Sequence, residues 1–167
     1  MKIILYILLM LTQVVYSQSR LDSLILEEVN SYRTSLNLQP VTFSNDCFEV
    51  SETHTKKLVD LKDSIFRFGA KPYHSGRTTG GEVIAPIVNY RISIDEKDPD
   101  SILAKAILNK WKESKEHNRI ITSEKYKFTG VSTKMVEDKK IIKVWNKDEQ
   151  KFKSIYTYTL FSTMNFK

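Results

Sequence analysis

Three short segments of the chain carry the side chains that are best suited to chemistry. His74 lies in a Tyr-His-Ser segment (73–75), Glu82 in a Gly-Glu-Val-Ile-Ala run (81–85), and His117 ends a Trp-x-x-Ser-x-x-His string (111–117). Two imidazoles and a carboxylate in apolar and aromatic surroundings can bind a divalent metal or carry out acid/base chemistry. His74, Glu82 and His117 are therefore the candidate metal ligands of this chain.

Ser114 adds a hydroxyl three residues before His117, a spacing at which two side chains near a helix end can approach each other. A base beside a serine is the general scheme for activating that nucleophile. The sequence identifies neither an oxyanion hole nor an orienting acid, so Ser114 is a catalytic candidate without a complete constellation. His54 stands alone on a helix, and we expect it to be a satisfied core or boundary residue.

The first 17 residues have the pattern of a secretory signal peptide. Lys2 gives a basic start, an apolar run of about nine residues follows, and the segment ends in Val-Tyr-Ser at Ser17. Such a run is too short to span about 30 Å of hydrocarbon comfortably, which argues against an anchor. We expect residues 1–17 to be removed and residues 18–167 to form one secreted domain, extracellular or periplasmic, with no transmembrane segment.

Composition limits the remaining possibilities. Cys47 is the only cysteine, so the domain has no internal disulfide and depends on packing, and we expect Cys47 to be buried. Residues 122–167 carry 10 Lys+Arg against 5 Asp+Glu, a balance of +5. We expect these lysines to be solvated at hairpin edges, where charge discourages edge pairing. The alternative is attraction to an anionic surface, such as a membrane or an acidic glycan.

A recognised nucleic-acid motif is absent from the sequence, so we expect no nucleic acid partner, and we expect a monomer. Helical spacing of apolar residues predicts helices over 21–36, 45–61 and 99–111, with a helical turn over 117–121. Ser19 with Asp22 resembles a capping box, and Asp98 before Pro99 is a typical helix start. Residues 62–80 contain several glycines and a proline and predict a long loop that carries His74.

A period of two predicts strands over 82–88, 128–136, 141–145 and 155–164, the last three joined by turns. The last of these is apolar or aromatic on both faces, as expected for a central strand covered by helices.

The order of these segments resembles the CAP superfamily, the cysteine-rich secretory, antigen 5 and pathogenesis-related proteins, and within it the bacterial SCP-like branch. The likeness covers roughly residues 22–164. It is carried by Asn30 and Arg33, Ser51 and His54, His74, Gly81 and Glu82, the Trp111–His117 string, and Thr129, Gly130 and Val131. Val83 and Asn118 depart from the family pattern, which has Asn and Arg at these positions.

The resemblance implies an α/β fold, an α-β-α sandwich with a three- or four-stranded mainly antiparallel sheet between helices. It also implies a cleft of two histidines and two acidic residues, in which His74, Glu82 and His117 fill three positions and Ser114 the fourth. Either a divalent metal such as zinc lies between the histidines, or a hydrogen-bonded cluster attaches the loop to the helix without metal.

Two functional classes follow from the resemblance. The first is a secreted binding or interaction module whose cleft recognises a divalent metal, a lipid, a glycan or a peptide without turnover. The second is a metal-assisted extracellular hydrolase, most plausibly a peptidase. We favour the binding module, and the sequence leaves open whether the protein is an enzyme.

Overall fold

The structure is a computed structural model that describes residues 18–76, 80–136 and 140–167. The predicted signal peptide (1–17), residues 77–79 of the predicted loop and the predicted turn at residues 137–139 lie outside the described residues. In chain order the elements are α2 (Arg20–Ser35), β1 (Thr42–Phe43), α3 (Asn45–Asp60), α4 (Lys62–Phe68), β2 (Gly81–Ser93), α5 (Pro99–Glu113), α6 (Lys115–Ile121), β3 (Phe128–Met135), β4 (Lys140–Asn146) and β5 (Lys151–Phe166).

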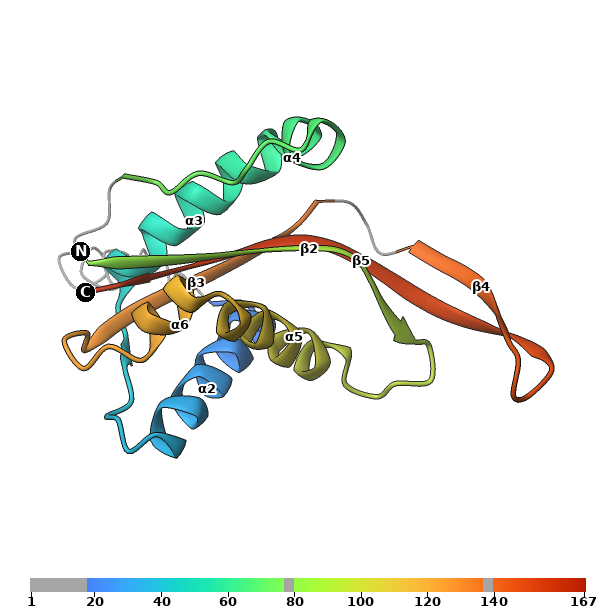
Figure 1. Cartoon of the computed structure of the whole chain (residues 1–167), viewed down its shortest axis with the longest axis horizontal. Coiled ribbons are helices and arrows are strands. Elements are labelled where there is room, and N and C mark those ends of the chain that lie inside the picture. Colours follow the sequence, from blue (N-terminus) through green and yellow to red (C-terminus); the bar gives the residue numbers. More distant parts are fainter. Residues whose placement is uncertain (1–17, 77–79, 137–139) are drawn as a thin grey trace, which may run out of the picture.

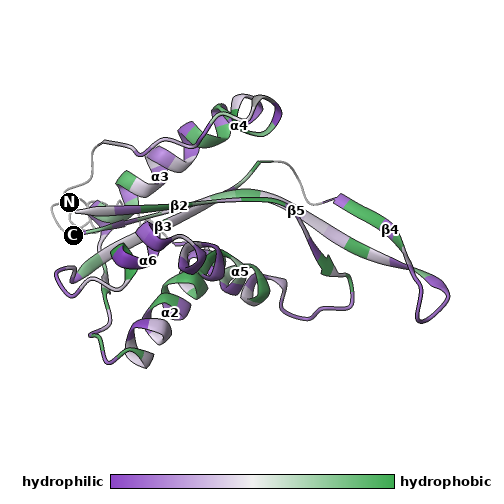
Figure 2. Cartoon of the chain, viewed as in Figure 1, coloured by the Kyte–Doolittle hydropathy of each residue, from purple (hydrophilic) through white to green (hydrophobic). Residues whose placement is uncertain are grey.

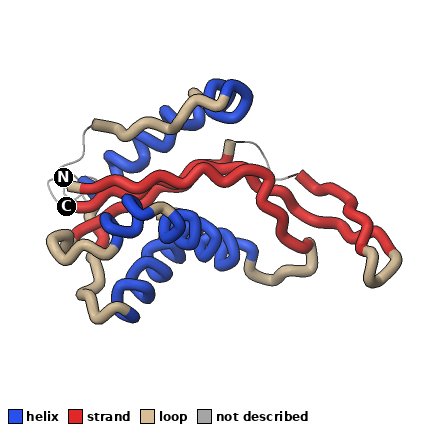
Figure 3. Tube along the Cα trace, in the orientation of Figure 1, coloured by secondary structure: helices blue, strands red, loops and turns tan. Residues whose placement is uncertain are grey.

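The strands form one mixed, mostly antiparallel sheet in the order β1-β3-β5-β2, and β4 pairs with β5. Helices α3 and α4 lie on one face of this sheet, and α2, α5 and α6 lie on the other (Figure 1, Figure 3). The predicted α-β-α sandwich is confirmed. The sheet has five strands because the two-residue strand β1, which the sequence pattern did not predict, pairs in parallel with β3.

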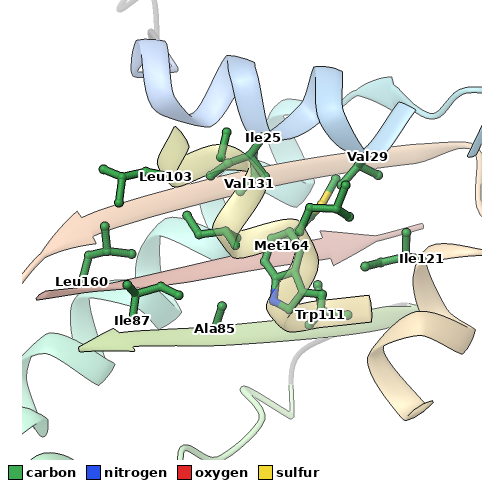
Figure 4. Packing of buried hydrophobic residues seen from close by; sticks show 14 of the residues in the cluster. Ile25, Val29, Ala85, Ile87, Leu103, Trp111, Ile121, Val131, Leu160 and Met164 are labelled. Atoms are coloured by element: carbon green, nitrogen blue, oxygen red, sulfur yellow. The ribbon is translucent and has the colours of Figure 1, made fainter. Parts of the chain in front are cut away.

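Strand β5 lies between β3 and β2 in the sheet, as the apolar character of both its faces predicted. Its even-numbered residues Leu160, Met164 and Phe166 join the main core, together with residues of α2 and α5 such as Trp111 (Figure 4). Phe161 points to the other face and packs with Leu58 of α3. The two helical layers therefore share one central strand as their packing surface.

The predicted helix starts are confirmed. Ser19 accepts the N–H of Asp22 at 3.1 Å, and Asp22 in turn accepts the N–H of Ser19, so the capping box is complete. Asp98 accepts the N–H of Ser101 before Pro99 opens α5. Cys47 is buried as expected, and burial raises the pKa of its thiol, which disfavours the reactive thiolate.

The prediction of one long loop over residues 62–80 is wrong for its first part, because residues 62–68 form α4. Phe66 of this helix stacks on Phe161 with ring centroids 5.0 Å apart. Burial of this apolar side chain favours a helix, although the glycines and the proline of the segment suggested a loop. Gly69 ends α4 in the left-handed region (φ 70°), which glycine adopts without steric cost. The segment from 70 to 75 then returns as an extended stretch along α3 (Figure 1).

Two strands extend beyond their predicted ends. Strand β2 continues past Val88 through an irregularity in its pairing with β5, where Asn89 takes a positive φ of 50°. It then pairs again from Tyr90 to Ser93. Strand β5 begins at Lys151 and forms a hairpin with β4 that extends well beyond the sandwich (Figure 1). The alternation pattern marks a strand centre better than its ends, because end residues are less buried.

Arg33, one of the two first-helix residues of the family pattern, fixes the end of α2. Its guanidinium is almost completely buried and donates to the backbone carbonyls of Gln39, Ile121 and Ser123. Asn30 exchanges two hydrogen bonds with the backbone of Val41. These two side chains thus satisfy backbone groups of the link after α2 and of the end of α6, and so hold α6 and its histidine in place.

Candidate functional site

The centre of the candidate site is the carboxylate of Glu82, the second residue of β2, which is only 4% exposed. Alternation along β2 sends Val83 into the main core beneath α5, and so turns Glu82 and Ile84 toward the α3 layer. A buried carboxylate requires partners. The partners of Glu82 include His54 on α3, His74, and the backbone N–H of Ser75.

Each oxygen of this carboxylate has its own partners. Oε1 lies 2.9 Å from Nδ1 of His54, and Oε2 lies 3.0 Å from Nδ1 of His74 and 2.8 Å from the N–H of Ser75. Burial by itself would raise the pKa of Glu82, but the hydrogen bonds from His54 and Ser75 outweigh burial and lower that pKa to about 2. Glu82 is therefore ionised at neutral pH, and both imidazoles donate to it through Nδ1–H.

His74 lies at the surface, since 58% of its side chain is exposed, whereas the carboxylate that holds it is buried. The imidazole of His117, near the start of α6, meets His74 edge to face, with ring centroids 6.3 Å apart. Burial and the neighbouring His74 lower the pKa of His117, which favours its neutral form. The structure therefore brings together His74, Glu82 and His117 from a loop, a strand and a helix.

Ser114 lies at the start of the same helix, where it caps the helix. It is the N-cap of α6, and its hydroxyl accepts the backbone N–H of His117 at 3.4 Å. The hydroxyl thus binds the backbone of His117 at the first turn of α6, an arrangement that satisfies a helix end. This contact gives no support to the expectation of a serine activated by the imidazole of His117.

His54 is the site residue that sequence reasoning missed, because a lone histidine on a helix is usually a core residue. Its side chain is 1% exposed, Nδ1 donates to Glu82, and Nε2 is buried without a hydrogen-bond partner among the described residues. The sequence did indicate that His54 is buried, because it lies four residues before the apolar Leu58 and so shares with it the face of α3 that packs against the sheet. Only the position of Glu82 in β2 shows that this face meets a carboxylate.

A groove of about 360 Å³ opens beside this cluster, between α3 and the segment that returns along it. One wall carries side chains of α3, His54 lines the groove, and Tyr73 and Ser75 form the opposite wall. The rings of His54 and Tyr73 lie 5.5 Å apart, and Tyr73 is 47% exposed. The groove is lined by Asp46, Glu49, Val50, Thr53, His54, Lys57, Tyr73 and Ser75.

The donor atoms of the cluster limit what it can bind. Both oxygens of Glu82 already accept hydrogen bonds, so Glu82 orients His74 and leaves Nε2 of that ring for any further ligand. Within residues 18–76, 80–136 and 140–167, no group of three or more His, Cys, Asp or Glu side chains is arranged to hold a metal ion. The arrangement leaves two imidazoles, His74 and His117, one fewer than the three protein ligands typical of catalytic zinc.

Comparison with known proteins assigns the family. Residues 26–148, more than half of the chain, match the model of the CAP family, described as the cysteine-rich secretory protein family. The chain therefore belongs to the CAP family, as the resemblance of its motifs predicted. The match lies within the predicted domain of residues 18–167. No curated protein matches the sequence.

Two solved structures match the chain. One is an outer surface protein of Borrelia burgdorferi, with a TM-score of 0.52 and 14% identity, over 90% of this chain and 95% of that one. The other is a cysteine-rich secretory protein of Staphylococcus aureus, with a TM-score of 0.44 and 11% identity, over 91% of this chain and 40% of that one. At this identity the first supports the fold alone. Among the helices of the described residues, none combines the length and the apolar character that a membrane crossing requires.

Proposed function

We propose that this protein is a secreted binding module whose ligand site is the groove beside the cluster of His54, His74, Glu82 and His117. The observation that carries the proposal is the buried, ionised carboxylate of Glu82, which holds two imidazoles and a backbone N–H at 2.8–3.0 Å. These bonds fix the segment with Tyr73 and Ser75 as a wall of the groove. A preformed wall lowers the entropic cost of binding.

The lining of the groove favours a polar ligand. Asp46, Glu49 and Lys57 contribute charges, Thr53 contributes a hydroxyl, and the half-exposed ring of Tyr73 offers a flat surface. This mixture suits a glycan or a short peptide, which combines hydrogen-bonding groups with a face that can stack on an aromatic ring. A lipid chain would find few apolar contacts here, so we place a glycan or a peptide before a lipid as the ligand.

The first test is a screen of a glycan array and a peptide library with the purified protein. We expect Tyr73→Ala to weaken the binding of any hit by about tenfold or more, because exposed aromatic anchors dominate small interfaces. Phe128→Ala is the matched control, since Phe128 is 46% exposed but does not line the groove. A hit whose affinity falls equally in both variants binds elsewhere, and that result would contradict the proposed site.

The metal-assisted hydrolase is the second candidate, and one observation favours it. His74 and His117 lie close together, and His117 has a lowered pKa, which favours the neutral ring with one nitrogen available as a ligand. Under this proposal His74 and His117 are the metal ligands, and Glu82 orients His74. The predicted role of Glu82 as a third ligand would use a carboxylate oxygen that already accepts a hydrogen bond in the structure.

Calorimetry with zinc tests this candidate. We expect zinc to bind through His74 and His117, more weakly than at a three-ligand site, and the affinity to fall in acid because the ligand nitrogens must be unprotonated. His74→Ala and His117→Ala should each remove most of the binding, and His54→Ala should retain it. Equal binding by the three variants would show that zinc binds elsewhere. Peptide cleavage that stops with chelator and in both ligand variants would favour the hydrolase over the binding module.

A further inference from the structure

The hairpin formed by β4 and the first part of β5 contributes no residue to the groove or to the histidine cluster. The pairing of β2 with β5 ends at Ile155, and Ile94 donates one further bond to the carbonyl of Ser154, so residues 151–153 of β5 pair with β4 alone. Figure 1 shows this ribbon extending beyond both helical layers. The hairpin therefore exposes side chains that elsewhere in the sheet would be covered by helices.

Apolar side chains gather on one face of this hairpin. Phe152 is 65% exposed, Ile141 59% and Trp145 49%. Trp145 lies directly opposite Phe152 in the register, and their rings meet edge to face at 5.1 Å. Ile141 lies opposite Tyr156, further along the same face. Figure 2 shows the hydrophobic colour continuing along β4.

This face is the continuation of the core face of β5. Phe152, Tyr156, Tyr158 and Leu160 alternate onto one side of the strand, and the last two are buried in the main core. Phe152, near the start of β5, lies beyond the helices that cover Tyr158 and Leu160. The core pattern thus continues as an exposed stripe, which we name the hairpin stripe: Ile141, Trp145 and Phe152.

The charge around the hairpin stripe is positive. Residues 140–153 contain five lysines against Asp148 and Glu149, a balance of +3 (5 − 2). Lys143 lies between Ile141 and Trp145 on the stripe face, and Lys147 lies in the turn. Lys151 and Lys153 both pair with Glu149, which sets that carboxylate between two ammonium groups. The tip therefore combines exposed aromatic rings with an excess of flexible cations.

We infer that the hairpin is a docking device for anionic lipid bilayers, a function beyond the proposed ligand groove. Trp and other amphipathic or aromatic rings favour the interfacial region of a bilayer, and lysines extend their ammonium groups to the lipid phosphates. Electrostatic attraction and shallow apolar insertion reinforce each other in this mode of binding. The protein then lies on the membrane surface through residues 140–153, with the groove on the sandwich body, away from the hairpin tip.

Tryptophan fluorescence gives a direct readout, because the chain has only two tryptophans. Trp111 is fully buried in the core, and Trp145 is half exposed on the hairpin stripe. We expect vesicles of phosphatidylglycerol and phosphatidylcholine to shift the emission to the blue and to co-sediment the purified protein, whereas phosphatidylcholine vesicles alone do neither. Trp145→Phe should abolish the spectral shift but keep co-sedimentation, because Phe still inserts.

Two sets of variants separate the apolar and the electrostatic contributions. Trp145→Ala with Phe152→Ala should weaken vesicle binding by about tenfold or more, whereas Val88→Ala, at a site that is 50% exposed on β2, leaves it unchanged. Lys143→Gln with Lys147→Gln should weaken binding by about fivefold for each lysine, and Lys71→Gln with Lys105→Gln should weaken it less. All these proteins share one N-terminus, so residues 1–17 do not contribute to the differences.

Three results would overturn the inference. The first is wild-type protein that stays in the supernatant with anionic vesicles at low salt. The second is vesicle binding that the double aromatic variant retains in full. The third is a wild-type dimer in solution that becomes monomeric in that same variant, because the hairpin stripe would then be an interface between two copies of the chain.

Discussion

Replacing Glu82 with glutamine is expected to lower the free energy of unfolding by about 3 kcal/mol at pH 7. The pKa of Glu82 falls from 4.5 to about 2 on folding, and each tenfold change in an acid dissociation constant corresponds to about 1.4 kcal/mol. The lowered pKa thus measures how strongly the fold favours the ionised carboxylate. A glutamine has one acceptor oxygen where the carboxylate has two, and its NH₂ group faces a donor that the carboxylate accepts.

The sign of the pH dependence follows from the direction in which the pKa moves. A depressed pKa in the folded state adds stability that is present above the unfolded pKa of about 4.5 and is lost as the pH falls through about 2. The difference between wild type and Glu82→Gln should therefore be full at pH 7, less than half as large at pH 3, and smallest below pH 2. Chemical denaturation at these pH values measures it.

Glu49→Gln is the matched control, because Glu49 is an exposed carboxylate on the rim of the same groove. We expect its effect on stability to stay within about 0.5 kcal/mol. A difference for Glu82→Gln that does not change between pH 7 and pH 3 would mean that shape, and not charge, accounts for the loss. In that case the role of Glu82 as the ionised centre of the cluster would be wrong.

The sequence predicted those parts of the molecule whose determinants are local. The helix caps at Ser19 and Asp98 and the alternation in β5 are determined by neighbouring residues, and the structure places each of them as expected. The association of His74 with Glu82 was available only from the family resemblance, because one side chain belongs to a loop and the other to a strand, and no periodicity relates the two.

The features that the sequence did not predict depend on contacts between distant segments. Helix α4 is stabilised because Phe66 packs against Phe161, which lies 95 residues further along the chain (161 − 66). Strand β1 is two residues long and is defined only by its partner β3. His54 joins the site because α3 crosses the sheet above the start of β2, where Glu82 turns toward it. In each case the local sequence is equally typical of another structure or role, and only a contact with a distant segment determines which one is adopted.

Gly130→Ala is expected to destabilise the protein by about 3 kcal/mol, because the backbone of α3 lies directly against β3 at this glycine. A Cβ at residue 130 would lie 2.1 Å from the backbone N of Phe48 and 2.6 Å from the carbonyl carbon of Cys47. These atoms belong to the backbone of α3, so the helix itself must move. Ser51 donates to the carbonyl of Gly130 at 2.7 Å, and that bond is strained or lost with the movement.

Ser51→Ala separates the steric effect from the lost hydrogen bonds. It removes the bonds that the Ser51 hydroxyl makes to Gly130 and Asn165 but leaves the close approach of α3 to β3 intact. We expect it to lower the free energy of unfolding by about 1–2 kcal/mol, clearly less than Gly130→Ala. Equal losses in the two variants would show that the hydrogen bonds, rather than the space at residue 130, hold the helix against the sheet.

The position of α3 also determines the site, because His54 reaches Glu82 from this helix. A helix displaced by Gly130→Ala carries His54 away from the carboxylate and weakens the bond that lowers the pKa of Glu82. The loss caused by Glu82→Gln should then be smaller in the Gly130→Ala background than in the wild type, and a double-mutant cycle at pH 7 measures the difference. Losses that simply add would mean that α3 keeps its place above Glu82, and the packing at Gly130 would then have no influence on the cluster.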